Sequence, residues 1–155
     1  SKEYTNGIPT KWENRTTKGS QTQAGPRGVA LEYMVELCEE VGAAMWLAVP
    51  QLADDPYILS MAAVLNTTTK MLYVLDSYQV AFFGGTGVKG HVDRSVHIWS
   101  LMAQVFGTER PFGKVLSCHG PNALNECYHA LAVLDANATA QAIVTHISVP
   151  GMLTI

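Results

Sequence analysis

Charged residues are sparse in this 155-residue chain, and it has no long hydrophobic run. Charged residues make up 15% and the formal net charge is −3, which argues against a nucleic-acid binder with its usual basic face. No apolar run approaches the roughly 20 residues of a membrane span, so we expect none. The hydrophobic fraction of 48% still predicts one folded domain with a core of its own.

Cysteine is also scarce, whereas glycosylation sequons are frequent. Of the three cysteines, Cys118 and Cys127 are close enough in sequence to form a disulfide, and isolated cysteines are often small buried hydrophobes instead. Three of the six asparagines, Asn14, Asn66 and Asn137, lie in N-x-S/T sequons. We therefore expect an extracellular glycoprotein, although the chain opens with polar residues and shows no signal peptide.

The hydrophobic pattern predicts an α/β fold. Residues 1–26 are polar and contain Gly and Pro, which indicates an irregular N-terminal arm before a domain at 27–155. Strands separated by helices of this length pair in parallel, so we predict a four-stranded βα-repeat sheet. The predicted helices are 27–41, 56–66, 91–106 and 121–135, and the predicted strands are 43–50, 70–76, 114–120 and 140–149.

Two details of this pattern concern the core. Leu37 and Val41 fall on the apolar face predicted for the helix at 27–41. The strand that contains Trp46 is predicted to be buried, and Trp99 lies on the apolar face of the helix at 91–106. We therefore expect both tryptophans to be core residues.

Several segments resemble one known family. Trp12 and Arg15, followed by RGVALEYMVELCEEVGAAMWLAVPQLADDPY at 27–57, resemble secreted glycoside-hydrolase-like (β/α)8 barrels of the cellulase-like clan. The resemblance continues through 70–76, RSVHIWSLMAQVFG at 94–107 and KVLSCHGPN at 114–122. It implies that the chain forms about half of a TIM barrel, from after the second strand to after the sixth, without the strand that carries the nucleophile.

The chain departs from the family pattern where catalysis is expected. Tyr78 stands where the family has Asn, and Gln79 stands where it has the acid/base Glu. Gln51 replaces the family's His after the third barrel strand. Hydrolysis of a glycoside generally needs two carboxyl groups, and a glutamine cannot supply a proton at neutral pH. The resemblance therefore implies a glycosidase-like protein that has lost its acid/base group.

Three carboxylates near predicted strand ends are the remaining catalytic candidates: Asp54, Asp55 and Asp76. The alternative for Asp54 and Asp55 is capping of the helix that begins at Pro56, and the alternative for Asp76 is ordering of a loop. The candidate ligand-binding residues, chosen from the arm, the strand ends and the family positions, are Trp12, Arg15, Gln51, Gln79 and His119.

No cofactor or metal is expected. Gly85, Gly87 and Gly90 match the letters of the dinucleotide fingerprint, but eight residues separate them from the strand that ends at Asp76, which favours an ordinary loop. The cysteines and histidines at 118–129 do not have a familiar zinc spacing.

Three hypotheses follow. The first is a non-catalytic extracellular domain that binds carbohydrate or serves as a structural unit. The second is an active glycoside hydrolase with relocated carboxylates, or with strands supplied by another chain. The third is a subunit of a homo-oligomer or larger assembly, because four parallel strands without closure leave two unpaired edges.

Overall fold

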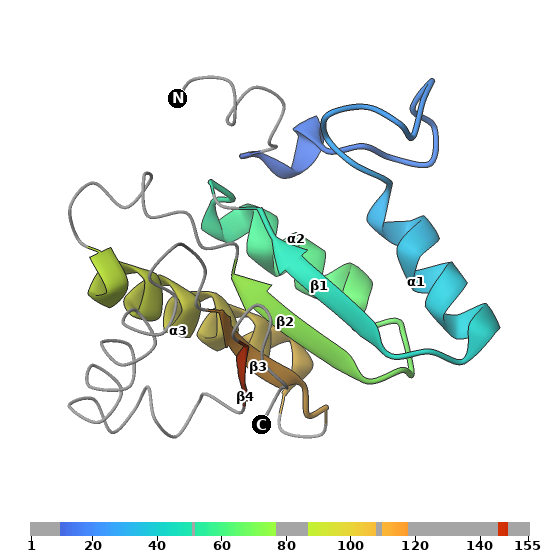
Figure 1. The fold of residues 1–155 in the computed structure, drawn as a ribbon. Helices are drawn as coiled ribbons and strands as arrows, with labels where there is room; N and C mark the ends of the chain where they lie inside the picture. Colours follow the sequence, from blue (N-terminus) through green and yellow to red (C-terminus); the bar gives the residue numbers. More distant parts are fainter. Residues whose placement is uncertain (1–9, 51, 77–86, 108–109, 118–145, 149–155) are drawn as a thin grey trace.

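The computed structural model describes residues 10–50, 52–76, 87–107, 110–117 and 146–148. Its centre is a parallel sheet in the order β1-β2-β3-β4 (Figure 1). The strands are β1 (Met45–Val49), β2 (Leu72–Asp76), β3 (Gly113–Ser117) and a short β4 (His146–Ser148). The helices are η2 (Trp12–Asn14), α1 (Leu31–Val41), α2 (Asp55–Leu65) and α3 (Gly87–Phe106).

The mixed α/β class and the alternation of strands with helices are confirmed for three strands. The chain runs from β1 through α2 to β2, and then through α3 to β3, with parallel pairing throughout. Three residues of the strand predicted at 140–149 pair with β3 as β4. The helix predicted at 121–135 lies outside the described residues.

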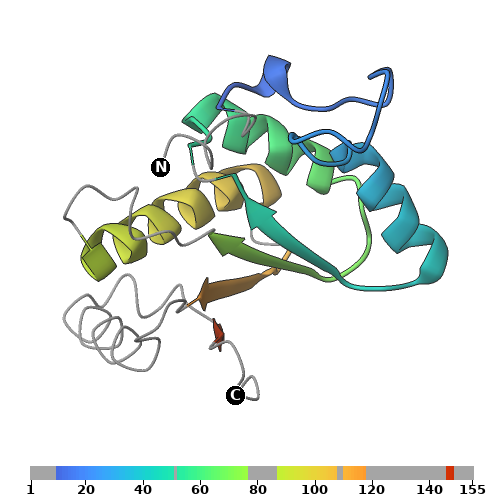
Figure 2. The ribbon, with the colours of Figure 1, turned by 45° about the horizontal axis from the view of Figure 1, so that its top comes forward.

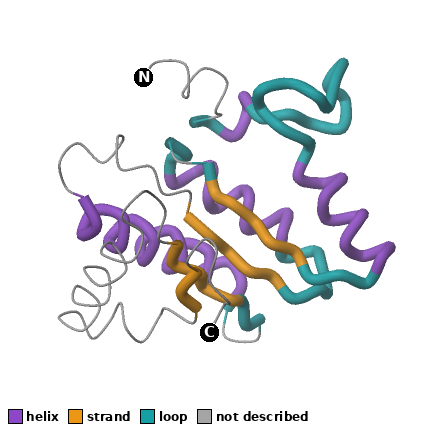
Figure 3. The backbone as a smooth tube through the Cα atoms, viewed as in Figure 1, coloured by secondary structure: helices purple, strands orange, loops and turns teal. Residues whose placement is uncertain are grey.

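The elements form two layers and an outlying helix. Figures 1 and 2 show α2 and α3 together on one face of the sheet. In both views α1 lies on the side of β1 away from β2, beyond the edge of the sheet. Figure 3 shows the loop-rich arm on the side where β1 ends and α2 begins. The arm therefore lies near the carboxyl end of β1, where α/β proteins usually place their sites.

Local sequence explains where the helices begin and end. Gly28 has a φ of +75°, which a right-handed helix does not allow, and α1 accordingly begins at Leu31 rather than at the predicted residue 27. Gly42 has a φ of +70° and its N–H bonds back to Cys38 and Glu39, which ends α1 as predicted. The helix predicted at 91–106 is α3, and it begins at Gly87 instead of residue 91.

One core prediction is confirmed and one is wrong. Trp99 is fully buried between α3 and the sheet, and its indole N–H donates to the Val74 carbonyl over 3.3 Å. Trp46 instead has 49% of its surface exposed. The reason is that buried and exposed residues alternate along β1, because helices cover only one face of this strand.

The predicted apolar face of α1 is also corrected. Leu37 and Val41 are 62% and 63% exposed, although the helical period placed them with the core residues. Only Val35 is buried among the residues of α1, while Leu31, Met34 and Cys38 pack partly against the core. An outlying helix has too few neighbours to cover a wide apolar stripe, so part of the stripe faces solvent.

Candidate functional site at the carboxyl end and open edge of β1

The aspartate pair after β1 serves the start of α2. Asp54 is the N-cap: its side chain accepts from the Tyr57 N–H over 2.9 Å and pairs with Lys11 of the arm. The hydrogen bond from Lys11, and then the one from Tyr57, hold the pKa of Asp54 below its ordinary value. Asp55 lies in the first turn and contacts the His97 ring nitrogen at 2.9 Å. The capping role predicted for Asp54 is confirmed.

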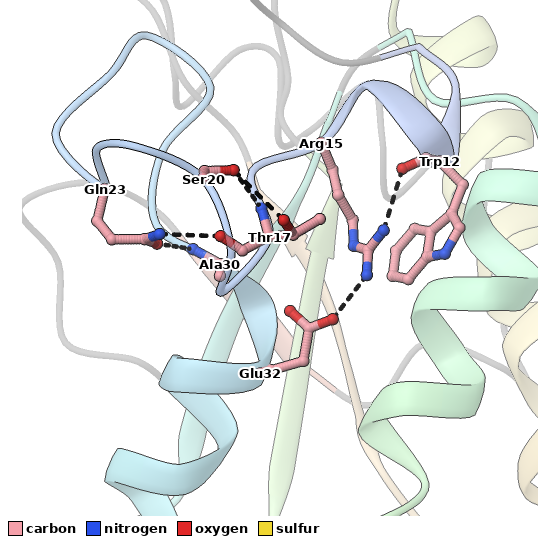
Figure 4. Close-up of polar contacts among 7 residues, drawn as sticks. All are labelled: Trp12, Arg15, Thr17, Ser20, Gln23, Ala30 and Glu32. Atoms are coloured by element: carbon pink, nitrogen blue, oxygen red, sulfur yellow. Dashed lines mark hydrogen bonds and ion pairs between the residues drawn. The ribbon is translucent and has the colours of Figure 1, made fainter.

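Trp12 and Arg15, two predicted ligand-binding residues, anchor the arm (Figure 4). The Trp12 ring meets the Tyr57 ring edge-on, with centroids 5.2 Å apart and planes at 82°. The Arg15 guanidinium lies 3.8 Å from the centroid of the Trp12 ring and pairs with Glu32 of α1 at 2.6 Å. One arginine therefore joins the arm to α1, while Trp12 joins it to α2. Ligand binding by Trp12 and Arg15 stays a prediction.

Glu32 is the residue of this cluster that sequence reasoning missed. Burial raises the pKa of its carboxyl, but the hydrogen bond from Arg15, a backbone hydrogen bond and the nearby positive charges outweigh burial and lower it overall. Glu32 therefore stays ionised and keeps Arg15 in place. The Arg15 Nε and Glu32 Oε2 atoms are buried with no partner in the described part of the chain.

A side-chain bridge orders the rest of the arm. The Gln23 amide donates to the Thr17 carbonyl and accepts from the Ala30 N–H, both over 2.9 Å (Figure 4). Ser20 accepts from the Thr17 N–H over 3.0 Å and closes a turn. The irregular segment thus satisfies its backbone through side chains, and its last residues approach β1.

Two residues on the outer edge of β1 have backbone groups that no other part of the described chain bonds to. The Met45 N–H donates to Met71 across the ladder to β2 over 2.8 Å, and residue pairing continues in register to Val49. Alternate residues of a strand direct their N–H and C=O groups to opposite edges, so those of Trp46 and Ala48 point away from β2. No described residue bonds to them.

A pocket of about 500 Å³ lies against this edge. Its walls come from the end of the arm, α1, β1 and α2. Trp46 forms part of the wall and stacks on Tyr73 of β2, with ring centroids 5.9 Å apart and planes at 29°. Most of the lining side chains are apolar: Val29, Leu31, Met34, Trp46, Leu47, Ala48, Val49, Pro50, Tyr57 and Met61, beside Pro26, Arg27 and Gly28.

Exposed apolar residues also occur at Val29 and along α1, which together form part of the pocket wall. Val29, Tyr33, Leu37 and Val41 are each more than 40% exposed and follow one another at four-residue steps. Residues four apart lie on the same side of a helix, so the last three form a row along α1. The apolar pocket therefore lies between a strand edge that no described residue pairs with and a helix that carries an exposed apolar row.

A second charged cluster lies at the other end of α1. Hydrogen bonds from the Thr68 hydroxyl and the Thr69 N–H, assisted by Lys70, lower the pKa of Glu39 to about 2. These bonds tie α1 to the loop that leads into β2. The Arg110 guanidinium donates to the Leu65 carbonyl. This bond connects the loop between α3 and β3 to the end of α2.

The other predicted residues are placed as follows. Asn14 and Asn66 are both exposed, and Asn66 is also the C-cap of α2. Asp76 ends β2 in register with Val49, and its side chain lies outside the described residues. Also outside them are Gln51, Gln79, Cys118, His119, Cys127 and Asn137. No described helix is both long and apolar enough to cross a membrane.

Within the part of the chain that is described, no three His, Cys, Asp or Glu side chains form a group able to hold a metal ion. Comparisons with protein-family models, curated proteins and solved structures found no match. The geometry of the site therefore carries the functional argument.

Proposed function

We propose that this chain is a non-catalytic, glycosidase-like structural subunit of an extracellular assembly, and that it joins the assembly through the open edge of β1. We also propose that the chain forms about half of a TIM barrel, as the family resemblance implies. One observation carries it: β1 presents backbone groups that no described residue bonds to, and α1 beside it has an exposed apolar row and helps to line an apolar pocket.

Within the described residues, the edge lacks the features that normally keep a strand from pairing. Soluble proteins protect edge strands with lysine, proline, bulges or a covering element. The sequence of β1 is MWLAV, which contains no charge and no proline. Each added inter-strand hydrogen bond is worth a net of about 0.5–1.5 kcal/mol, and covering exposed apolar side chains adds to that gain.

The non-catalytic part of the proposal is supported by what the carboxylates do. Asp54 holds the start of α2 and the arm, and Asp55 contacts His97. Both have structural partners, and among the described residues neither contacts a second carboxylate. Gln79, which stands at the family's acid/base position, offers only hydrogen bonding.

Carbohydrate binding in the pocket is a second candidate. Trp46 and Tyr73 form a stacked aromatic pair with Trp46 about half exposed, and the β1 backbone groups that no described residue bonds to lie along the same wall. The apolar face of a sugar ring packs on an aromatic ring while its hydroxyls bond to polar groups. In this case a soluble oligosaccharide binds and changes the Trp46 fluorescence, and Trp46→Ala abolishes binding without changing the native mass.

The native mass of Ala48→Pro tests the main proposal. The Ala48 N–H points away from β2, so proline there removes no hydrogen bond of the β1–β2 ladder but blocks an incoming strand. Ala48→Val is the matched control, because it keeps the N–H. We expect an oligomer for the wild type and the control, and a monomer with an unchanged circular dichroism spectrum for Ala48→Pro. A wild-type monomer at micromolar concentration would contradict the proposal.

A further inference from the structure

The position of α1 beside the sheet leaves a place next to β1 that no described strand occupies. In a βα repeat each helix covers the junction of two neighbouring strands, as α2 does for β1 and β2. On the side of β1 away from β2, where α1 lies, no described strand is next to β1 (Figures 1 and 2). The pocket between α1 and β1 and the exposure of Leu37 and Val41 agree with a missing strand at this place.

The opposite end of the sheet, at β4, also has an edge that no described strand covers. β4 pairs with β3 on one side, and no described strand pairs with its other side. All described strands run parallel. A β4 placed against β1 would therefore continue the sheet in the same direction, and α1 would cover the new junction as the other helices cover theirs.

We propose that the occupant of the β1 edge is a second copy of this chain, in a two-fold ring. The β4 strand of each copy pairs in parallel with β1 of the other. This inference rests on the proposed function and names its partner. Two four-stranded sheets give eight strands, the number that closes a parallel (β/α)8 barrel. Closure removes every sheet edge.

The arrangement favours a head-to-tail contact over direct pairing of two β1 edges. A two-fold axis beside β1 would bring two α1 helices to the same junction, where a βα repeat has room for one. Head-to-tail contacts instead form a ring when the rotation between copies closes, and two copies of a half-barrel close after one step. The ring also places the open sheet face, with Trp46 and Ala48, toward the barrel interior.

Native mass spectrometry of paired edge variants tests the ring. Ala48→Pro blocks the β1 edge. Proline is placed in turn at Ile147 and Ser148 to block the β4 edge, because successive residues direct their N–H groups to opposite sides of a strand. The wild type is expected at about 34 kDa, twice the 16.8 kDa of one chain. Ala48→Pro, and the β4 variant whose proline lies on the outer side of the strand, are expected at half that mass. A mixture of a β1-edge variant and a β4-edge variant retains one intact interface and regains the dimer.

The other outcomes are distinguishable. A dimer that is lost in Ala48→Pro but kept in both β4 variants means direct β1–β1 pairing, which overturns the ring and leaves the proposed function standing. A larger oligomer or a fibre overturns ring closure in the same way. A monomeric wild type overturns both. If the proline variants fail to fold, Ala48→Lys replaces them: its charge stays in solvent in the monomer but would enter the barrel interior, so a surviving wild-type-like dimer contradicts the ring.

Discussion

Gly113 at the start of β3 offers a sharp test of the open sheet face. A Cβ added at Gly113 would lie 2.3 Å from Cδ1 and 3.3 Å from Cγ of the Tyr73 ring. Both atoms are close to the base of the side chain, so the whole ring has to move, and its stack with Trp46 at 5.9 Å is lost. Gly113→Ala is therefore expected to destabilise the fold by about 1–3 kcal/mol, the usual cost of overpacking.

Thermal unfolding at a fixed protein concentration measures this cost. A chain of this size loses about 2–4 °C in melting temperature per kcal/mol, so the expected decrease is about 2–12 °C. In a Tyr73→Ala background the clash is absent, and Gly113→Ala becomes neutral or stabilising by about 0.5–1 kcal/mol. Gly25→Ala is the matched control, because a Cβ there meets no atom within 4 Å. Equal losses in both backgrounds would refute the reasoning.

Three further predictions concern charge and modification. Asp54→Ala removes a helix cap and is expected to cost about 0.5–2 kcal/mol in urea unfolding, whereas a loss no greater than that of Asp55→Ala would argue against the cap. The pKa of Glu39 is about 2 in the folded chain and about 4.5 when unfolded, so its contribution to stability is present above pH 4.5 and lost as the pH falls toward 2. Unfolding curves should show a shallower loss over that range for Glu39→Gln, and an unchanged slope would contradict the assignment. Expressed through a secretory pathway, the chain is expected to lose mass on enzymatic removal of N-glycans, with smaller losses in Asn14→Gln and Asn66→Gln; an unchanged mass contradicts glycosylation.

Patterns local in sequence predicted most of the described elements. The βα alternation, the Asp54 cap and the Gly42 helix end each depend on residues a few positions apart, and all three are present. The burial of Trp99 also followed from the helical period. These features are predictable because nearby residues decide them.

Features set by distant neighbours were not predictable in the same way. The period of α1 cannot reveal that no described element covers its outer side, so the exposure of Leu37 was missed. The strand pattern likewise could not show that β1 is an edge strand with Trp46 on its open face. The pair between Arg15 and Glu32 joins an irregular arm to a helix, and no repeat or spacing rule connects them.

Amide hydrogen exchange at β1 tests the central claim most directly. The Leu47 N–H faces β2 and serves as an internal reference, whereas the N–H groups of Trp46 and Ala48 face the outer edge. If a strand of a partner covers this edge, Trp46 and Ala48 exchange as slowly as Leu47 at high protein concentration and faster on dilution. Fast exchange of Trp46 and Ala48 at every concentration, with Leu47 still protected, would contradict the account.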